Sequence, residues 1–323
     1  MERVGVDGRE VEEALHDPRL EAVDLEHDPE LRLLVQWFKH RFGKGLLAVI
    51  FMGSCLSELT KSEDSFRDFF CILESYKYAH NVFKRWFHRI LPPELYHLAL
   101  PLPGGREVHC KYYILSLEDL IRTTGPRAPD LYVLGRLSKR VAVVYARDQE
   151  AREEVNKALA SAASQAVRRA AALVDRPMSE EEFYKLVLQI SYLGERRLED
   201  ERKIEALFQA GEAYYRKVYG KLVSRLLYEG CLQRLEDGRL LADYDHPGVD
   251  KEAVEAFIRR SRRRAMLRWP KMMITVDNWV DQLLAKLERT HGIKLEIPAW
   301  ERPFILITGW RHFFRLWRQG KVR

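Results

Sequence analysis

A Gly-Ser pair and an aspartate, each next to an apolar run, could together bind a nucleoside triphosphate. Gly53-Ser54 follows the apolar run 46–52, and Asp68 opens a second apolar run, 68–73. Glycine lets a backbone approach a phosphate closely, and a serine hydroxyl and backbone N–H groups can donate hydrogen bonds to it. A carboxylate such as Asp68 can bind the magnesium ion that accompanies the phosphates. The pattern predicts a strand, a phosphate-binding turn and a second strand that begins with a metal ligand.

A second carboxylate on the face of Asp68 would complete a typical two-carboxylate metal site. Residues i and i+2 of a strand share a face, but the i+2 position is Phe70. Glu74 lies on the same face, about 20 Å further along an ideal strand. Glu74 is therefore a candidate metal ligand only if the strand bends or ends early. The alternative is a solvated acid at the end of the strand.

The elements that must position these residues alternate between helix and strand in the first half of the chain. Apolar spacing predicts an amphipathic helix over 31–42, which Gly43-Lys44-Gly45 ends. Further elements are expected as strands at 46–52, 68–73 and 107–115, helices at 78–90 and 116–122, and a turn-and-strand region at 131–145.

The second half is predicted to be mainly helical. Residues 149–174 contain no glycine or proline, and Ser179 with Glu182 forms a capping-box pattern at the start of the next helix. Helices are also expected at 199–229, 250–268 and 277–290, and strands at 272–276 and 293–297. The fold class is thus α+β, with an N-terminal extension (1–30), a mixed domain (31–147), a helical domain (148–230) and a basic C-terminal region (231–323).

The charge of the chain is concentrated near its C-terminal end. The 323 residues are 46% hydrophobic and carry a formal net charge of +6, but residues 251–323 hold 17 Lys and Arg against 7 Asp and Glu. This asymmetry indicates a membrane surface or a nucleic acid as partner, or a solvated positive face without one. The four cysteines lack metal-ligand spacing, which favours buried thiols in a reducing compartment. We expect no signal peptide and no membrane-spanning helix.

Several ordered segments resemble the mitochondrial-type phosphatidate cytidylyltransferases, over about residues 50–225. The most specific is the stretch 131–141, which contains Gly-Arg-Leu-Ser-Lys. The others are the stretches 52–54, 68–74, 111–112 and 190–197. The resemblance implies a nucleotidyltransferase domain like that of DNA polymerase β, a winged-helix-like helical domain and the bacterial branch of the family. The family often has Gly-Ser-Gly where this chain has Gly53-Ser54-Cys55.

The resemblance also implies an activity, in which CTP and phosphatidate give CDP-diacylglycerol and pyrophosphate with Mg²⁺. It assigns catalysis to Asp68, Lys111 and Arg136, and metal binding to Asp68 and Glu74. Nucleotide binding falls to Gly53, Ser54, Lys139, Tyr192, Glu195 and Arg197. The alternatives are surface charges for the lysines and arginines and a packing role for Tyr192.

The C-terminal segment could dock the protein on a membrane, where phosphatidate resides. Aromatic and arginine side chains fall on different faces of a predicted helix, the pattern of an interfacial helix, and the arginines at 259–264 add a basic cluster. The residues expected at the lipid are Arg311, Phe313, Phe314, Arg315, Trp317 and Arg318. This implies a peripheral protein on the cytoplasmic, inner face of a membrane. The helix could instead pack on the core or stack on nucleic-acid bases.

Two other functions fit parts of the pattern. The chain could be a nucleotidyltransferase for another acceptor, such as RNA or a small alcohol. It could also be a basic nucleic-acid-binding protein with a degenerate nucleotidyltransferase domain, which the missing second carboxylate favours. The first interpretation predicts no stable nucleic-acid partner and leaves the oligomeric state open.

Overall fold

The structure is a computed structural model, and it describes residues 28–56, 66–79, 91–194 and 201–275, with isolated residues beyond (284, 297–298, 301, 308–311 and 318). The chain divides into two compact units, Met1–Met272 and Met273–Arg323. The helices and strands between Pro29 and Met272 belong to the first unit, and the last three residues of the final helix, 273–275, fall in the second.

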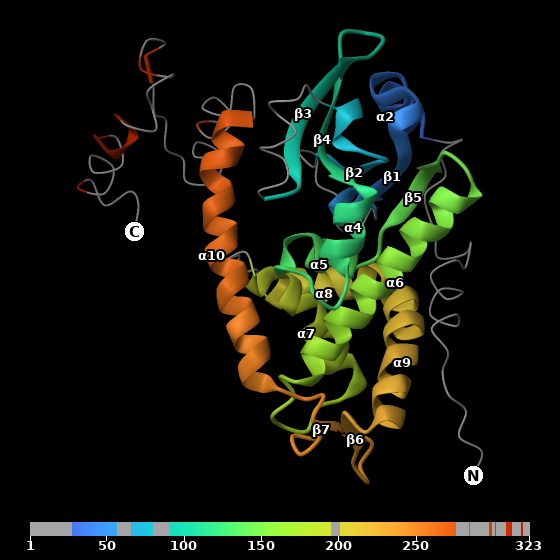
Figure 1. Ribbon diagram of the computed structural model, residues 1–323, viewed down its shortest axis with the longest axis vertical. Coiled ribbons are helices and arrows are strands. Elements are labelled where there is room, and N and C mark those ends of the chain that lie inside the picture. Colours follow the sequence, from blue (N-terminus) through green and yellow to red (C-terminus); the bar gives the residue numbers. More distant parts are fainter. Residues whose placement is uncertain are drawn as a thin grey trace. The chain divides into compact units, whose positions relative to one another are not determined.

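A five-stranded mixed sheet lies at the centre of the first part of the chain (Figure 1). Its strand order is β3-β4-β2-β1-β5, in which β2 and β4 are parallel and the other neighbours antiparallel. The bounds are β1 Leu46–Met52, β2 Arg67–Leu73, β3 Glu94–Pro101, β4 Glu107–Ser116 and β5 Ala142–Ala146. The four strands other than β3 confirm sequence predictions, whereas β3 was not predicted.

Helices cover both faces of this sheet. Helix α2 (Pro29–Phe42) packs its buried side chains, among them Leu34 and Phe38, against one face. Helices α4 (Leu117–Thr124), α5 (Leu131–Leu137) and the first half of α6 (Gln149–Ala171) cover the other face. We call this second side the α5 face. The alternation along each strand places Asp68, Phe70, Lys111 and Tyr113 on the α5 face.

The prediction of a turn-and-strand region at 131–145 is wrong for its first half, which forms α5. Asp130 is the N-cap of this helix, and its side chain accepts a hydrogen bond from the Tyr132 backbone N–H at 3.0 Å. Leucine, tyrosine and valine in a short apolar run are compatible with a strand. The cap and the burial of Leu131 and Leu134 in the helical core decide for the helix.

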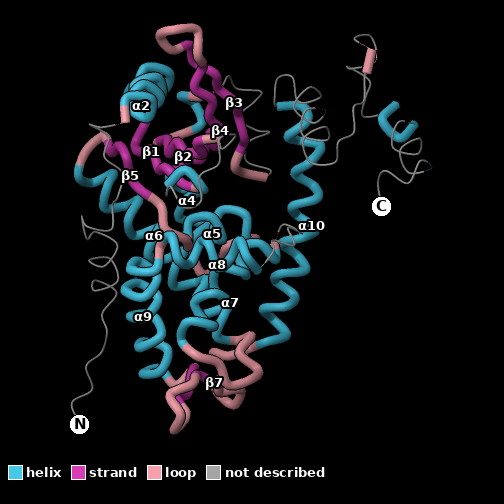
Figure 2. Tube along the Cα trace, turned by 180° about the vertical axis from the view of Figure 1, so that it is seen from behind, coloured by secondary structure: helices cyan, strands magenta, loops and turns pink. Residues whose placement is uncertain are grey.

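The second core is helical and is built around α7 (Glu180–Leu193), α8 (Glu201–Ala210) and α9 (Glu212–Glu229). The capping box is confirmed, since Ser179 and Glu182 exchange both side chain to backbone hydrogen bonds. A two-stranded hairpin, β6 (Leu232–Arg234) and β7 (Leu240–Ala242), follows α9. Figure 2 shows α7, α9 and β7 toward the end of the unit away from the large sheet.

Helix α10 (Lys251–Thr275) is longer than predicted. The expected strand at 272–276 is wrong for 272–275, because the helix continues through Pro270. A proline removes one intrahelical hydrogen bond and crowds the preceding turn, but kinked helices continue past it. The predicted helices at 78–90 and 277–290 and the strand at 293–297 fall largely outside the described residues.

Helix α6 takes part in both cores. Ala151, Val155 and Leu159 pack on the α5 face of the sheet. Further along the same helix, Ala163 and Val167 belong to the helical core. The predicted domain boundary at 147–148 therefore precedes a helix that both cores share.

None of the helices in the described part of the chain combines the length and the apolar character that a membrane crossing requires.

Candidate active site

The turn after β1 brings Gly53 against the carboxylate of Asp68. Met52 and Asp68 are partners in the β1–β2 ladder. Gly53 follows with φ at 91°, and a Cβ atom added to it would lie 3.1 Å from Asp68 Oδ2. The other carboxylate oxygen, Oδ1, is buried. The left-handed backbone favours glycine, and a Cβ atom here would require Asp68 Oδ2 to shift by a few tenths of an ångström, so the predicted pairing of glycine and acid is a close contact. Ser54 opens the short 3-10 turn Ser54–Leu56 that follows.

Lys111 lies beside Asp68 on the neighbouring strand. The two residues are partners in the parallel β2–β4 ladder, and Lys111 Nζ lies 4.5 Å from the ring centroid of Phe66. His97 faces Lys111 across the β3–β4 ladder. Burial, with the charges of Lys111 and His109, lowers the pKa of His97 to about 4. At neutral pH His97 is thus uncharged and Lys111 brings the positive charge next to Asp68.

Arg136 extends the positive surface over the same face of the sheet. Its guanidinium carbon lies 3.9 Å from the Tyr132 ring centroid and 5.6 Å from that of Tyr113. One guanidinium nitrogen, Nη1, donates to the Tyr132 carbonyl at 2.8 Å. Tyr113 lies two residues beyond Lys111 on β4, so α5 places Arg136 on the side of the sheet that carries Asp68 and Lys111.

Lys139 and Tyr192 come together where α5 ends beside α7. The Lys139 Nζ lies 4.3 Å from the Tyr192 ring centroid, and Lys203 approaches the same ring at 5.9 Å. Two glycines permit the close packing of α5 against α7. A Cβ on Gly135 would lie 2.9 Å from Ser191 Cα, and one on Gly194 would lie 2.7 Å from Leu131 Cβ. The structure thus joins two predicted nucleotide-binding residues, whereas Glu195 and Arg197 lie outside the described residues.

Glu74 is not brought to Asp68. The β2–β4 ladder runs without a register shift from Arg67 to Leu73, so the strand neither bends nor ends early. Glu74 follows the far end of β2, where it is 3.9 Å from Lys77 and 3.7 Å from Arg147. Glu74 therefore lies beyond the opposite end of β2 from Asp68.

One carboxylate beside a bare backbone fits a magnesium ion that arrives with a nucleotide. Magnesium commonly keeps several waters and is bound through one or two carboxylates and the substrate phosphates. Among the described residues, no group of three or more His, Cys, Asp or Glu side chains could form a complete protein cage. A Cβ atom at position 53 would lie 3.1 Å from Asp68 Oδ2, so glycine avoids crowding this carboxylate.

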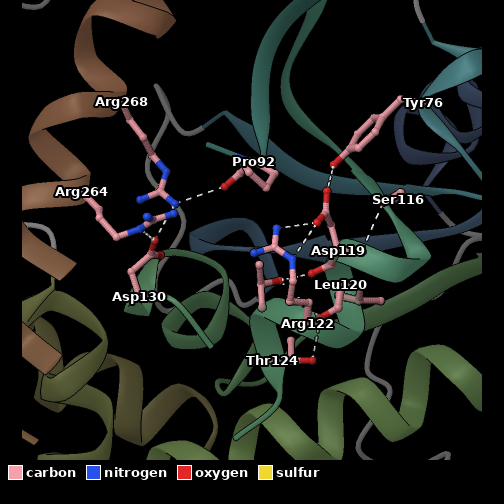
Figure 3. A network of polar contacts seen from close by, with 11 residues as sticks. Tyr76, Pro92, Ser116, Asp119, Leu120, Arg122, Thr124, Asp130, Arg264 and Arg268 are labelled. Atoms are coloured by element: carbon pink, nitrogen blue, oxygen red, sulfur yellow. Dashed lines mark hydrogen bonds and ion pairs between the residues drawn. The ribbon is translucent and has the colours of Figure 1, made fainter. Parts of the chain in front are cut away.

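Sequence reasoning missed an ionic cluster in which Asp130 and Arg268 are buried and Arg264 is partly exposed, and which we call the Asp130 cluster (Figure 3). The arginines at 259–264 were interpreted as a surface for anionic lipid, but Arg264 pairs with Asp130 and Arg262 Nε donates to the Leu193 carbonyl at 2.8 Å. Because Asp130 lies 134 residues from Arg264 in the sequence, spacing alone gave no signal of this contact.

Of the residues predicted at the lipid, Arg311 and Arg318 are described and exposed. Phe313, Phe314, Arg315 and Trp317 lie outside the described residues, so the interfacial helix stays a prediction.

A mixed sheet with a Gly53–Asp68 turn at a strand end, flanked by lysine and arginine, is compatible with the α+β fold of nucleotidyltransferases. The family model described as "Phosphatidate cytidylyltransferase, mitochondrial" matches residues 92–271, more than half of the chain. The chain belongs to this family and is a nucleotidyltransferase. Lys111, Arg136, Lys139 and Tyr192 lie within the matched segment, whereas Gly53 and Asp68 precede it. A search of curated proteins found no match to the chain.

Proposed function

We propose that this chain transfers the cytidylyl group of CTP to phosphatidate in a magnesium-dependent reaction at a membrane surface. A phosphate oxygen of phosphatidate forms a bond to the α-phosphorus of CTP. The bond from that phosphorus to the bridging oxygen breaks, and pyrophosphate leaves. The attacking oxygen is already anionic at neutral pH, so no strong general base is needed. Catalysis then consists of positioning and charge neutralisation.

The residues on the α5 face supply both the positioning and the charge neutralisation. Asp68 would hold the magnesium ion, which when bound offsets the charge of the triphosphate and of the leaving pyrophosphate. The bare backbone at Gly53 admits a phosphate close to that carboxylate, and Ser54 would donate a hydrogen bond to it. Lys111 and Arg136 neutralise phosphate oxygens, for which the planar guanidinium of Arg136 is well suited. Lys139 and Tyr192 bind the nucleotide from the α5–α7 side.

The contact of Gly53 with Asp68 is the observation that carries this proposal. Phosphate and metal binding would explain why a glycine with a left-handed backbone lies beside a partly buried acid. The test uses radiolabelled CTP with phosphatidate-containing vesicles and magnesium. We expect a lipid-soluble labelled product from the wild-type chain and none from Asp68→Asn. Intact CTP with the wild-type protein would refute the reaction, and full activity of Asp68→Asn would refute the metal site.

We further propose that the segment 304–323 docks the enzyme on the inner face of a membrane. The support is its pattern of aromatic and arginine residues, of which Arg311 and Arg318 are exposed. Deleting 304–323 should weaken flotation with anionic vesicles and leave CTP binding intact, whereas unchanged flotation would refute this role. We also propose that the helical core with the β6–β7 hairpin is the winged-helix-like domain, and that the chain belongs to the bacterial branch.

A further inference from the structure

Arg268 and Asp130 form a buried ion pair between α10 and the start of α5. The Arg268 side chain is 4% exposed and that of Asp130 is 3% exposed. The Nη2 atom of Arg268 donates to Asp130 Oδ2 at 2.9 Å and to the Pro92 carbonyl at 3.2 Å. Arg264 Nε donates to the same carboxylate oxygen at 2.6 Å. Figure 3 shows both arginines reaching from α10 to Asp130.

Two of the three guanidinium nitrogens of Arg268 are left without a hydrogen bond. Within the part of the chain that the structure describes, Nε and Nη1 are buried and have no hydrogen-bond partner. A buried donor left unsatisfied costs about 1–3 kcal/mol, and more for a charged group. Buried polar groups in native proteins are therefore almost always paired. Two such atoms on one side chain leave unused capacity for hydrogen-bond acceptors at Arg268.

The charge around Arg268 identifies the kind of ligand. Burial alone would raise the pKa of Asp130, but Arg268 and Arg264 together hold it below its ordinary value, so one negative charge faces two positive charges. Arg136 adds a third positive charge on Tyr132, whose ring centroid lies 3.9 Å from the Arg136 guanidinium carbon and 4.4 Å from that of Arg268. The Arg268 side chain is 4% exposed and shares the Asp130 carboxylate with Arg264, and a buried charge is costly unless anions offset it.

This positive cluster adjoins the site on the sheet. The Tyr132 ring contacts the Tyr113 ring with centroids 6.3 Å apart, and Tyr113 lies two residues beyond Lys111 on β4. Arg136 touches both rings. Tyr113 and Tyr132 therefore lie between the Asp68–Lys111 pair and Arg268 on the α5 side of the sheet.

We propose that Arg268, together with Arg136, binds a phosphoryl group of a substrate through its Nε and Nη1 atoms. A phosphate presents several oxygens that can accept charge-assisted hydrogen bonds from a guanidinium. Two substrates of the proposed reaction carry such a group, namely the triphosphate of CTP and the phosphomonoester of phosphatidate. The identity of the substrate rests on the proposed function, whereas phosphoryl binding at Arg268 can be tested without it.

The experiment compares Arg268→Gln and Arg268→Lys with Arg264→Gln in the full chain. Arg264 is the matched control, because it lies one turn away on α10 and pairs with the same oxygen of Asp130. Calorimetry measures the binding of pyrophosphate, and initial rates give KM separately for CTP and for phosphatidate in vesicles. Thermal melts by circular dichroism show which variants fold. Arg268→Lys keeps the charge but loses the extra donors, so it serves if Arg268→Gln does not fold.

We expect both Arg268 variants to weaken pyrophosphate binding, or to raise one KM, by about ten- to hundredfold, the value of one or two charge-assisted hydrogen bonds. Arg264→Gln should change these quantities less than about threefold. A rise in KM for phosphatidate alone assigns the subsite to the lipid phosphate, and a rise for CTP alone, or weaker pyrophosphate binding, assigns it to the nucleotide. Equal effects of Arg264→Gln and the Arg268 variants would overturn the proposal, as would wild-type values for Arg268→Lys.

The outcome also separates this proposal from the proposed function. Wild-type protein that binds pyrophosphate through Arg268 but makes no CDP-diacylglycerol would leave the subsite standing and remove the reaction. If the wild-type protein makes the product and the Arg268 variants are unchanged in binding and in both KM values, the reaction stands and the subsite is removed.

Discussion

The Cβ position of Gly53 lies 3.1 Å from Asp68 Oδ2, so the glycine and the acid compete for the same space. The backbone of Gly53 is also left-handed, with φ at 91°. Any side chain at position 53 would therefore strain the turn and push the carboxylate oxygen away by a few tenths of an ångström. This relationship allows strain and site geometry to be separated experimentally.

Gly53→Ala should lower the free energy of unfolding by about 1–2 kcal/mol through backbone strain and reduce cytidylyl transfer at least about tenfold through displacement of Asp68. Gly104→Ala is the control, because Gly104 has φ at 82° and no atom within 4 Å of its Cβ position. It should show a similar loss of stability in urea denaturation with activity unchanged. Equal loss of activity in the two variants would show that the contact with Asp68 is irrelevant.

Glu74→Gln should leave the rate of CTP turnover within about twofold of wild type. Glu74 is half-exposed, and its ion pairs with Lys77 and Arg147 are surface contacts of small energetic value. Asp68→Asn, by contrast, should lower the rate on the order of hundredfold or more, because a metal ion stabilises charge by several kcal/mol. A large loss in Glu74→Gln would restore the two-carboxylate metal site.

Gly135→Ala should destabilise the protein by about 1–3 kcal/mol, since the added methyl group would lie 2.9 Å from the Ser191 backbone. Gly220→Ala offers a comparison within a helix, where the nearest atom is the Tyr184 hydroxyl at 3.3 Å. There the gain in helix propensity, about 1 kcal/mol, opposes the mild crowding. Urea denaturation should separate the two variants clearly. Similar midpoints would mean that α5 and α7 can move apart without cost.

Lys139→Met should weaken CTP binding by about tenfold if Lys139 contacts a phosphate, the value of one charged hydrogen bond. Lys203→Met is its control, because Lys203 approaches the same Tyr192 ring from 5.9 Å instead of 4.3 Å. Isothermal titration of both variants with CTP and magnesium provides the measurement. Identical affinities would place Lys139 among packing contacts.

The stability that Asp130 contributes should depend on pH. The pKa of this carboxyl is lower in the folded state than its ordinary value of 3.8, so its folded form binds fewer protons than the unfolded form near pH 4. The contribution is therefore complete above about pH 4 and is lost as the pH falls through the folded-state pKa. We expect Asp130→Asn to be less stable than wild type at pH 7, with a difference that shrinks below pH 4. Chemical denaturation at both pH values tests this, and a constant difference would contradict it.

Sequence patterns within a single element correctly predicted that element. Uninterrupted apolar runs identified β1 and β2, and the Ser179–Glu182 capping box identified the start of α7. Strand β3 escaped prediction because it is an edge strand whose residues are mostly half-exposed, which leaves only a weak pattern. In α5 the tertiary environment overrode a locally ambiguous run, and α10 continued past a proline that ordinarily marks a boundary.

The residues of the site that lie within recognisable sequence patterns were predictable, and the long-range contacts were not. Strand order places Lys111 beside Asp68, and both residues had been selected from the sequence. The Asp130–Arg268 pair joins residues 138 positions apart, so only the folded chain reveals it.

The shared helix α6 bears on how this protein can be dissected. A fragment cut before residue 148 would expose Phe70, Val133 and neighbouring apolar side chains to water, and a fragment that starts there would carry an uncovered hydrophobic stripe of its own. Neither piece should be soluble alone, and denaturant should melt sheet and helices in one transition. The sheet and the helical core would then be stable only when one polypeptide carries both.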